Sequence, residues 1–406
     1  MLVLFLPPPL WLSARQFFGE EAEKAFLAIR LNCNVKVDYL VPEDAMNLNT
    51  TVQRWRTTVA QLLLPGLHGH QAKALADLSW AIALSGNCQA GRLATHVPTA
   101  AKPASSRRRC ERLLDNARLP PRVAQRQLAQ ALLQQASGQT LLLLLDETPK
   151  GNDLRVLSIR VAYRRRALPL AALCYRPEAL PQPQPRLVRS LLRQVLACLP
   201  PQARVVLLAD RGLAWPLLVD WCQEHGWHYV LRLQRTTRVR FPDGSERSVA
   251  DLVPCRGRRW LGEAEVFKKA GWRGAQVVAT WERDQREAWL LLTDEWASLR
   301  HCRVYSKRTW VEEAHRDDKG AAFHWEQSQV VDPAHALRLL LLIALATVLA
   351  ASQGTAVLKG GHRRALDPHR VRRLSVVQLG LRWLRYAVEH GLYDHLKLGR
   401  LYLYPK

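Results

Sequence analysis

The stretch TLLLLLDET, residues 140–148, decides the fold. Its uninterrupted run of five leucines is typical of a strand that is buried on both faces of a sheet. The run ends in Asp146, so the strand would carry a carboxylate out of the hydrophobic layer to the rim of the sheet. Sheets of α/β proteins commonly form their sites at such a rim. We therefore interpret residues 140–148 as the first strand of an α/β domain with a candidate site residue at its end.

The residues that follow extend this pattern into a sheet. A second strongly apolar strand ends at Asp210, which precedes Arg211 and Gly212. Three early strands followed by alternating helices and strands indicate a mixed sheet, not a purely doubly wound one. An acid after a strand is often only a turn former or a helix N-cap, so neither aspartate identifies a site alone. The expected strands are 156–162, 168–174, 204–209 and 228–233, and the expected helices are 187–199 and 215–225.

Further segments surround this sheet. Short strand candidates at 237–241, 264–267, 275–281 and 288–292 lie between glycine, proline and charged turns, and they predict a β-rich insertion at about 234–293. Helices at about 305–319 and 336–351 would complete a catalytic domain of residues 140–357, which a basic helical tail, 358–406, follows. Residues 1–45 are an N-terminal extension, either a genuine arm or the product of a misassigned start, because Met46 opens a more regular helical pattern.

Residues 46–139 have helical periodicity and predict a DNA-binding domain. A helix, a turn at 85–87 and a short helix at 89–96 lead to a linker, a basic run and a helix at 110–116. This order suits a helix-turn-helix module, and Arg107, Arg108 and Arg109 would contact DNA phosphates. The alternative is a plain helical bundle whose basic face is solvated.

The composition of the chain limits the classes of partner that it could bind. The 406 residues include 59 Lys and Arg against 35 Asp and Glu, a formal charge of +24, which favours a polyanionic partner such as nucleic acid. None of the eight cysteines has CxxC spacing, so zinc fingers and thioredoxin-like chemistry are poorly supported. The apolar run 339–351 is shorter than the roughly 20 residues that a membrane span needs, and we interpret it as a buried helix.

The most specific pattern is Y-x2-R-x3-E-x6-K, formed by Tyr305, Arg308, Glu312 and Lys319. On a regular α-helix these four side chains fall within a stripe about 60° wide, with the apolar residues 310, 311 and 314 facing the core. An acid flanked by two cations and a phenol suits a phosphodiester site, because the acid holds metal while the cations meet phosphates. Two alternatives are a capping box from Thr309 to Glu312 and a solvated charged surface.

With these residues in order, the chain resembles the insertion-sequence transposases of the IS-four type. The resemblance rests on the Tyr-Arg-Glu-Lys signature, on Asp-x-Thr after the first strand and on Asp-Arg-Gly after the fourth, and it covers roughly residues 50–355. It implies an RNase H-like fold with Asp146, Asp210 and Glu312 as catalytic metal ligands. It also implies that Tyr305, Arg308 and Lys319 contact DNA, and we add Arg211 and Arg232 as candidate phosphate contacts.

The resemblance implies a cut-and-paste DNA transposase that uses two Mg²⁺ ions, for which Mn²⁺ would substitute. Its partners would be double-stranded DNA, both terminal inverted repeats and target, and a second copy of the chain in the synaptic complex. It would be a bacterial cytoplasmic protein associated with the nucleoid and not with a membrane. The alternatives are a catalytically inactive DNA-binding descendant and a metal-dependent nuclease of the same fold. Trp281, Trp289 and Trp296 are open candidates for stacking on a flipped base.

Overall fold

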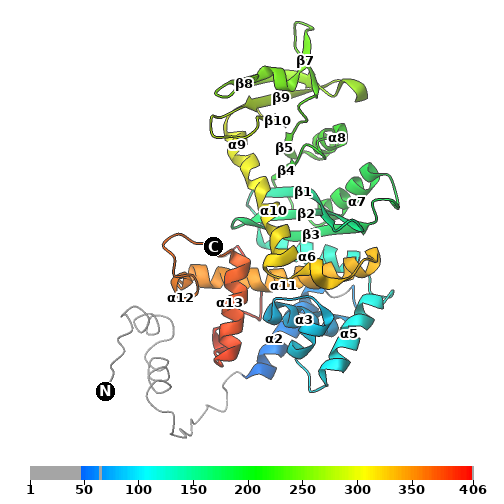
Figure 1. Ribbon diagram of the computed structural model, residues 1–406, viewed down its shortest axis with the longest axis vertical. Coiled ribbons are helices and arrows are strands. Elements are labelled where there is room, and N and C mark those ends of the chain that lie inside the picture. The colour runs from blue at the N-terminus through cyan, green and yellow to red at the C-terminus, as the bar shows by residue number, and fades with distance from the viewer. Residues whose placement is uncertain (1–46, 64–65, 405–406) are drawn as a thin grey trace.

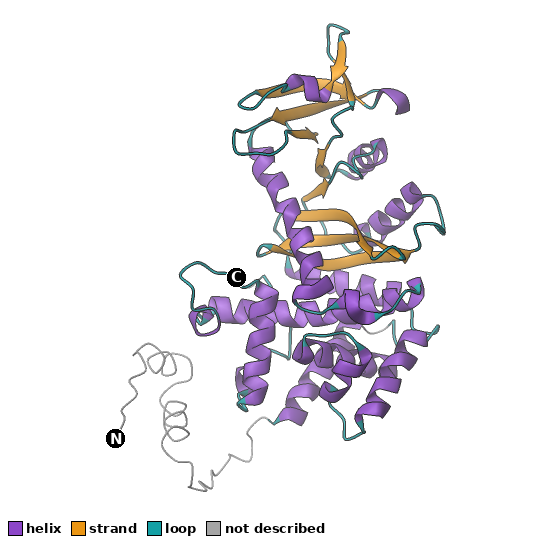
Figure 2. Ribbon diagram, viewed as in Figure 1, coloured by secondary structure: helices purple, strands orange, loops and turns teal. Residues whose placement is uncertain are grey.

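A computed structural model describes residues 47–63 and 66–404 of the chain; the expected extension at 1–45 lies outside them. The described residues form an α/β fold in which one mixed sheet lies between helices (Figure 2). The strand order is β3-β2-β1-β4-β5-β10-β9-β8-β6-β7. The strands are β1 (Leu141–Lys150), β2 (Leu154–Tyr163), β3 (Arg166–Tyr175), β4 (Val205–Ala209), β5 (His228–Arg232), β6 (Arg238–Arg240), β7 (Glu246–Ser248), β8 (Arg259–Val266), β9 (Arg273–Thr280) and β10 (Trp289–Thr293).

The centre of the sheet is the leucine strand. β1 runs parallel to β4 and antiparallel to β2, and β4 runs parallel to β5. The predicted strands are confirmed, but β1 continues to Lys150, so Asp146 lies inside the strand and not at its end. The local reason is the antiparallel partner β2, whose Leu154 pairs with Lys150 and keeps the backbone extended. The mixed order of these strands is consistent with an RNase H-like fold.

The β-rich segment continues the same sheet. β10 pairs antiparallel with β5, and β9, β8, β6 and β7 follow outward (Figure 1). The strands expected from sequence are present, and β7, only three residues long, is an addition that its charged sequence did not signal. The segment therefore extends the central sheet at one edge.

Helices cover both faces of the inner sheet and build a second layer below it. They are α2 (Leu48–Leu63), α3 (Gly69–Ser85), α4 (Ala90–Leu93), α5 (Pro103–Asp115), α6 (Pro121–Gln135), α7 (Gln184–Leu196), α8 (Pro216–His225), α9 (Arg300–Tyr305), α10 (Thr309–Arg316), α11 (Pro333–Lys359), α12 (Arg363–Leu366) and α13 (Val376–Glu389). α11 contacts β3 on one side and both α3 and α13 on the other. It joins the sheet to the helical layer (Figure 1).

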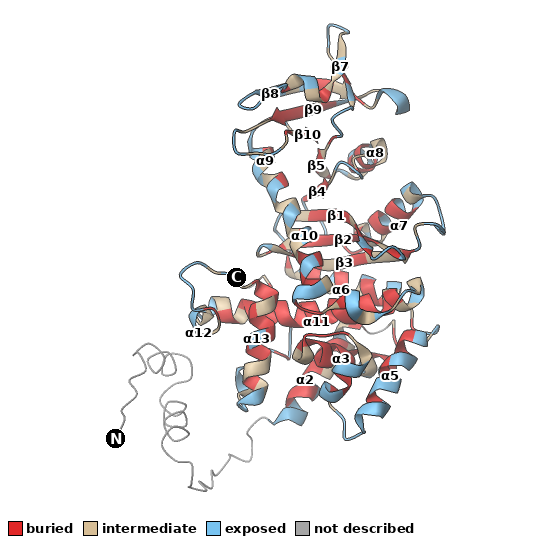
Figure 3. Cartoon of the chain, in the orientation of Figure 1, coloured by how far each residue is buried: buried red, intermediate tan, exposed pale blue. Residues whose placement is uncertain are grey.

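α11 is long and apolar enough to cross a membrane by length and composition. In this fold most of it is instead packed between the sheet and the helical layer, as Figure 3 shows. The prediction of a buried helix is confirmed, and the helix is longer at both ends than the 336–351 expected. Asp332 caps its start by accepting a hydrogen bond from the backbone N–H of His335 at 2.8 Å.

The basic run is placed differently from the sequence prediction. α5 begins at Pro103, so residues 107–109 lie inside the helix and not in a linker before it. Proline at the first helical position is pre-set to a helical φ and needs no N–H bond, which makes it a stronger start signal than the serines that follow. The three arginines therefore project from the body of α5.

Candidate active site

Three carboxylates meet around one guanidinium. Nη2 of Arg308 lies 2.5 Å from Oδ1 of Asp146 and 3.5 Å from Oδ2 of Asp210. Nη1 of Arg308 pairs with the carboxylate of Glu312, one helical turn further along the chain. Asp146 is nearly buried, Asp210 is partly exposed, and Glu312 is the most accessible of the three. The structure thus brings all three predicted acids to one place.

The sheet positions the two aspartates. Leu145 of β1 pairs with Ala209 of the parallel strand β4, so the next residue on each strand, Asp146 and Asp210, lie side by side. Oδ1 of Asp210 also accepts the backbone N–H groups of Gly212 and Leu213, at 2.9 and 3.2 Å. This turn fixes the side chain where β4 ends and leaves its other oxygen facing Arg308.

Helix geometry positions Arg308 and Glu312, although the helix is less regular than predicted. The path from 305 to 319 passes through a 3₁₀ turn at Ser306–Arg308, then α10, then a π turn at Asp317–Ala321. A uniform advance of 100° per residue therefore holds only over α10. Insertions of this kind are common at functional sites, because they re-aim side chains without ending the helix.

The two alternatives for this helix have different outcomes. No capping box forms at Thr309, because the helical path is already established and the Thr309 hydroxyl donates to the carbonyl of Ser306. The segment is a solvated charged surface only in part: Arg308 pairs with the exposed Glu312 one turn later, but Tyr305 is buried and Arg308 nearly so. Val311 and Ala314 pack into the core between α10 and the sheet, as predicted.

A hollow of about 420 Å³ opens beside the acids and is lined by Asp146, Thr148, Glu312 and Lys319 among others. Nζ of Lys319 lies 3.5 Å from Glu326 across it. The lysine of the signature and the threonine of the first strand therefore share one open cavity with two of the acids. A hollow lined by carboxylates and cations is suited to a charged, phosphate-bearing substrate.

A histidine that sequence reasoning missed supports Asp146 from behind. Nε2 of His315 lies 3.3 Å from Oδ2 of Asp146, and its Nδ1 lies 3.5 Å from Arg160. Burial and the charge of Arg160 lower the pKa of His315, which keeps the imidazole neutral near pH 7. The sequence did hold a signal for this histidine: His315 follows Glu312 by three residues, so the two side chains lie on the same face of the helix.

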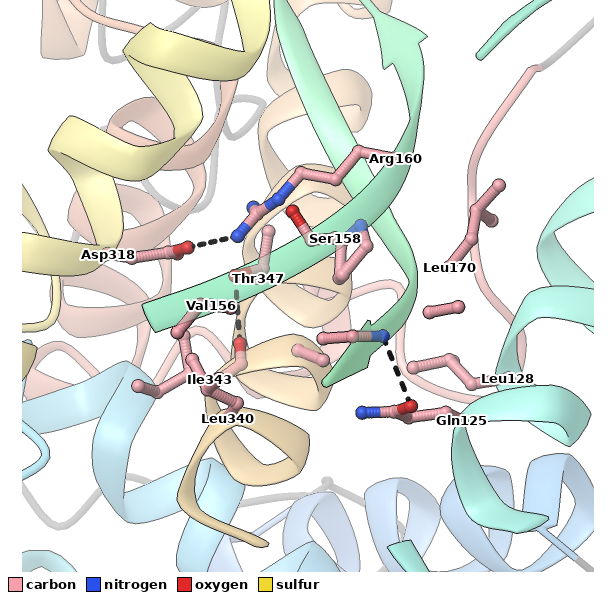
Figure 4. A pocket seen from close by; sticks show the side chains of 14 residues that line it. Gln125, Leu128, Val156, Ser158, Arg160, Leu170, Asp318, Leu340, Ile343 and Thr347 are labelled. Atoms are coloured by element: carbon pink, nitrogen blue, oxygen red, sulfur yellow. Dashed lines mark hydrogen bonds and ion pairs between the residues drawn. The ribbon is translucent and has the colours of Figure 1, made fainter. Parts of the chain in front are cut away.

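Behind His315 lies a buried ion pair. Nη2 of Arg160 lies 2.5 Å from Oδ2 of Asp318, and Figure 4 shows the two side chains pointing toward each other with Ser158 beside them. β2 changes register between Ile159 and Arg160, which aims the arginine at the helix. Nε of Arg160 and Oγ of Ser158 have no hydrogen-bond partner among the described residues, and a cavity of about 30 Å³ adjoins them. That volume is sufficient for one bridging water.

Charge around Asp146 keeps it ionised. Burial alone would raise the pKa of this carboxyl, but the contact with His315 and the charge of Arg308 together lower the pKa below its usual value. The carboxylate is therefore available as an anionic ligand throughout the neutral range.

The donor set fits a divalent metal by chemistry. Carboxylate oxygens are the hard ligands that Mg²⁺ and Mn²⁺ prefer, and here they already converge on one cation, Arg308. Within the described ranges 47–63 and 66–404, no three His, Cys, Asp or Glu side chains are spaced as ligands of a single ion. The present spacing is that of acids gathered around a guanidinium, whose positive charge compensates them as a metal would.

Tyr305 is buried, although the sequence predicted that it shares one helix face with the charged residues of the signature. Its ring packs edge-on against Trp289, with centroids 5.5 Å apart, and joins the core beneath α10. Burial raises the pKa of Tyr305 to about 12. Of the other tryptophans considered for base stacking, Trp281 is half-buried and its indole N–H donates to the carbonyl of Gln285, whereas Trp296 is 81% exposed.

Two of the remaining predicted DNA contacts lie next to Asp210, and three lie on α5: Arg211 follows Asp210 in the chain, and Arg232 follows Leu231, which pairs with Ala209. Arg211 and Arg232 both pair with Glu287, at 3.0 and 2.7 Å. On α5, low in Figure 1, Arg109 pairs with the buried Asp77, at 2.8 Å, and Arg107 with Glu111. Arg108 is exposed, and within the described residues it forms no ion pair. These side chains are accessible in varying degree, and their contact with DNA stays a prediction.

Comparison with known families gives one match. Residues 184–349 match the family described as transposase DDE domain. The matched range includes Asp210, Glu312 and the whole signature, and it begins after β1, which carries Asp146. No curated protein matches the chain.

Proposed function

We propose, from the match of residues 184–349 to the transposase DDE domain family, that this chain is a cut-and-paste DNA transposase. It would cleave DNA at transposon ends and join the freed ends to target DNA. The single observation that carries the proposal is the convergence of Asp146, Asp210 and Glu312 on Arg308 beside an open cavity. Three carboxylates gathered beside an open cavity are suited to metal-dependent phosphoryl chemistry.

Divalent metal ions are the general cofactor of DDE transposases, and we propose two Mg²⁺ ions, with Mn²⁺ as substitute, held by the three acids. When bound, such ions supply Lewis acidity at the scissile phosphate and make water a stronger nucleophile at neutral pH. His315 would hold Asp146 in orientation, and Arg308, once released from the carboxylates, would face the phosphates. Lys319, on the wall of the cavity, would add a second cation to the substrate strand.

The substrate of a transposase is DNA, and the formal charge of +24 favours a polyanion. We propose double-stranded DNA, both terminal inverted repeats and target, as partner, with a dimer in the synaptic complex. The proposal includes an RNase H-like topology for the inner sheet, a DNA-binding role for the helices of residues 46–139, and a place in the bacterial cytoplasm near the nucleoid. The mixed strand order and the exposed Arg108 on α5 support the first two.

The test is excision of a marker flanked by the element's own terminal repeats, in Mg²⁺, by wild type, Glu312→Gln and Glu313→Gln. Glu313 is the matched control: it adjoins Glu312 but pairs with Arg166 and Arg316, at 3.4 and 3.0 Å, away from Asp146. Excision by wild type and Glu313→Gln, but not by Glu312→Gln, is the expected result. Normal excision by Glu312→Gln would remove Glu312 from the triad.

Two other outcomes identify the alternatives. End binding without excision by any of the three proteins would favour an inactive DNA-binding descendant. Cleavage by wild type without joined products would favour a nuclease of the same fold. Strand-transfer products are therefore measured in the same reaction as excision.

A further inference from the structure

Two arginines form the tip of the β2–β3 hairpin in an unfavourable backbone conformation. Tyr163 pairs with Arg166, and the two residues between them, Arg164 and Arg165, have φ of 46° and 68°. A two-residue hairpin turn with both central residues at positive φ strongly prefers Asn-Gly, because Cβ lies too close to the following carbonyl oxygen there; Gly has no Cβ, and the short polar side chain of Asn tolerates the conformation. Strain of this kind, on the order of 1–3 kcal/mol for each residue, marks positions where a side chain has a function of its own.

The tip is anchored and meets a third arginine from the C-terminal region. The hydroxyl of Tyr163 hydrogen-bonds to that of Thr355 on α11 at 2.7 Å, and Arg164 lies over the Tyr163 ring. Nη2 of Arg372, between α12 and α13, lies 3.4 Å from the carbonyl of Arg164. The arginines are thus brought together by tertiary structure from segments about 200 residues apart, in a fixed arrangement.

Positive charge at this place is not balanced. Arg164, Arg165 and Arg372 form no ion pair with any described residue, whereas the adjoining Arg166 pairs with Glu313 and Asp317. Arg363 lies 3.6 Å from Asp367 and donates to the carbonyls of residues 369 and 370. Burial, together with repulsion from Arg165, Arg166, Arg164 and Arg363, lowers the pKa of Arg372. The three arginines that have no carboxylate partner, Arg164, Arg165 and Arg372, are suited to a polyanion.

We propose that Arg164, Arg165 and Arg372, the arginine patch, are a docking surface for the phosphodiester backbone of duplex DNA. The proposal rests on the proposed function, which supplies the DNA. Arg166, directly after the tip, pairs with Glu313 and Asp317, so the patch lies along the same helical segment that carries Glu312. Asp146 pairs with Ser158, six residues before Arg164 on β2, or about 20 Å at roughly 3.3 Å per residue. That spacing equals about six base pairs, so one short duplex is long enough to contact both the acids and the patch.

The turn itself gives the sharpest variant. Arg164→Asn with Arg165→Gly places the preferred residues at the two strained positions, so the protein is expected to unfold at the same or a higher temperature. Binding to a random-sequence duplex several helical turns long should weaken by about tenfold at moderate salt. The slope of log affinity against log salt should become less steep by up to about 2, roughly 0.9 for each lost phosphate contact. The matched control is Arg186→Ala with Arg189→Ala, which removes two exposed arginines from α7.

Each possible result either supports or overturns the arginine patch. A weaker, less salt-dependent tip variant with unchanged control supports the patch. Equal losses in both double variants would mean that net charge alone matters, and would overturn it. So would wild-type affinity and salt slope in the tip variant while wild type still excises DNA, a result that leaves the proposed function intact. Failure of wild type itself to bind duplex would instead overturn the proposed function together with the patch.

Discussion

Arg308 is a single side chain that compensates three acids from three elements. Asp146 comes from β1, Asp210 from the end of β4 and Glu312 from α10, and each contacts the same guanidinium. Like charges this close repel unless a cation lies between them. Arg308 and a divalent metal therefore provide the same compensation, and one should replace the other.

Arg308→Ala tests this exchange. Without added metal, the variant should be less stable than wild type by about 3 kcal/mol, because it leaves a nearly buried carboxylate unpaired. Adding Mg²⁺ should raise the melting temperature of the variant more than that of wild type, since only the variant lacks a cation among the acids. Thermal unfolding with and without Mg²⁺ measures both. An equal metal response in the two proteins would argue against a shared position.

His315 contacts the proposed metal ligand Asp146 and has no proposed contact with substrate. Its loss should therefore change the Mg²⁺ concentration that cleavage requires. His315→Leu removes the contact with Asp146 and fills the same buried position with an apolar side chain of comparable size. The Mg²⁺ concentration for half-maximal cleavage should rise about 10–100-fold, as for other residues that orient a metal ligand. Duplex binding measured without metal should not change. A purely structural role would instead lower the melting temperature and leave the metal requirement as it is.

At the scale of elements, helices α11 and α13 pack against each other most closely at two glycines, Gly354 on α11 and Gly380 on α13. A Cβ on Gly354 would lie 1.8 Å from the carbonyl oxygen of Val376, and one on Gly380 would lie 1.7 Å from that of Ala350. No rotamer relieves a clash between a Cβ and rigid helical backbone, so the helices must separate. The two glycines thus set how closely the helical layer packs.

Gly354→Ala or Gly380→Ala should therefore destabilise the protein by about 3 kcal/mol or more, the upper range for overpacking. Gly91→Ala, on the short helix α4, is the control, because its added Cβ meets nothing within 4 Å. The control should be neutral or stabilising by up to about 1 kcal/mol, since alanine favours helix. Denaturant unfolding of the three variants checks this. Tolerance of both alanines at wild-type stability would mean that the crossing is looser than described.

Sequence predicted most elements because their signals are local. The leucine run of β1, the apolar strand before Asp210 and the long apolar α11 each carry a recognisable period or run. What it did not predict depends on contacts distant in sequence. The orientation of His315 depends on Arg160 and Asp146, which lie more than 150 residues earlier in the chain. No local pattern encodes such contacts.

At the scale of the whole molecule, the same limit applies to the C-terminal segment. A basic tail was expected from its arginines, and its outward residues are basic, but its apolar residues pack inward. Nε of Arg385 on α13 donates to the carbonyl of Leu84 at the end of α3, at 2.7 Å. Gln353 on α11 exchanges two hydrogen bonds with the backbone of Lys397. The segment thus connects helices from the two ends of the described chain.

A chain that ends after Gly361 should therefore lose stability in the helical layer as well as the C-terminal residues themselves. Val377, Leu381 and Leu384 on α13 are buried, and burial of each such side chain contributes about 1.5–3 kcal/mol. Their sum is comparable with the 5–15 kcal/mol that stabilises a typical protein. The truncated chain should show a broadened, lower thermal transition and rapid proteolysis within α3. A sharp transition at the wild-type temperature, with α3 still protected, would make the segment an appendage and the helical layer self-sufficient.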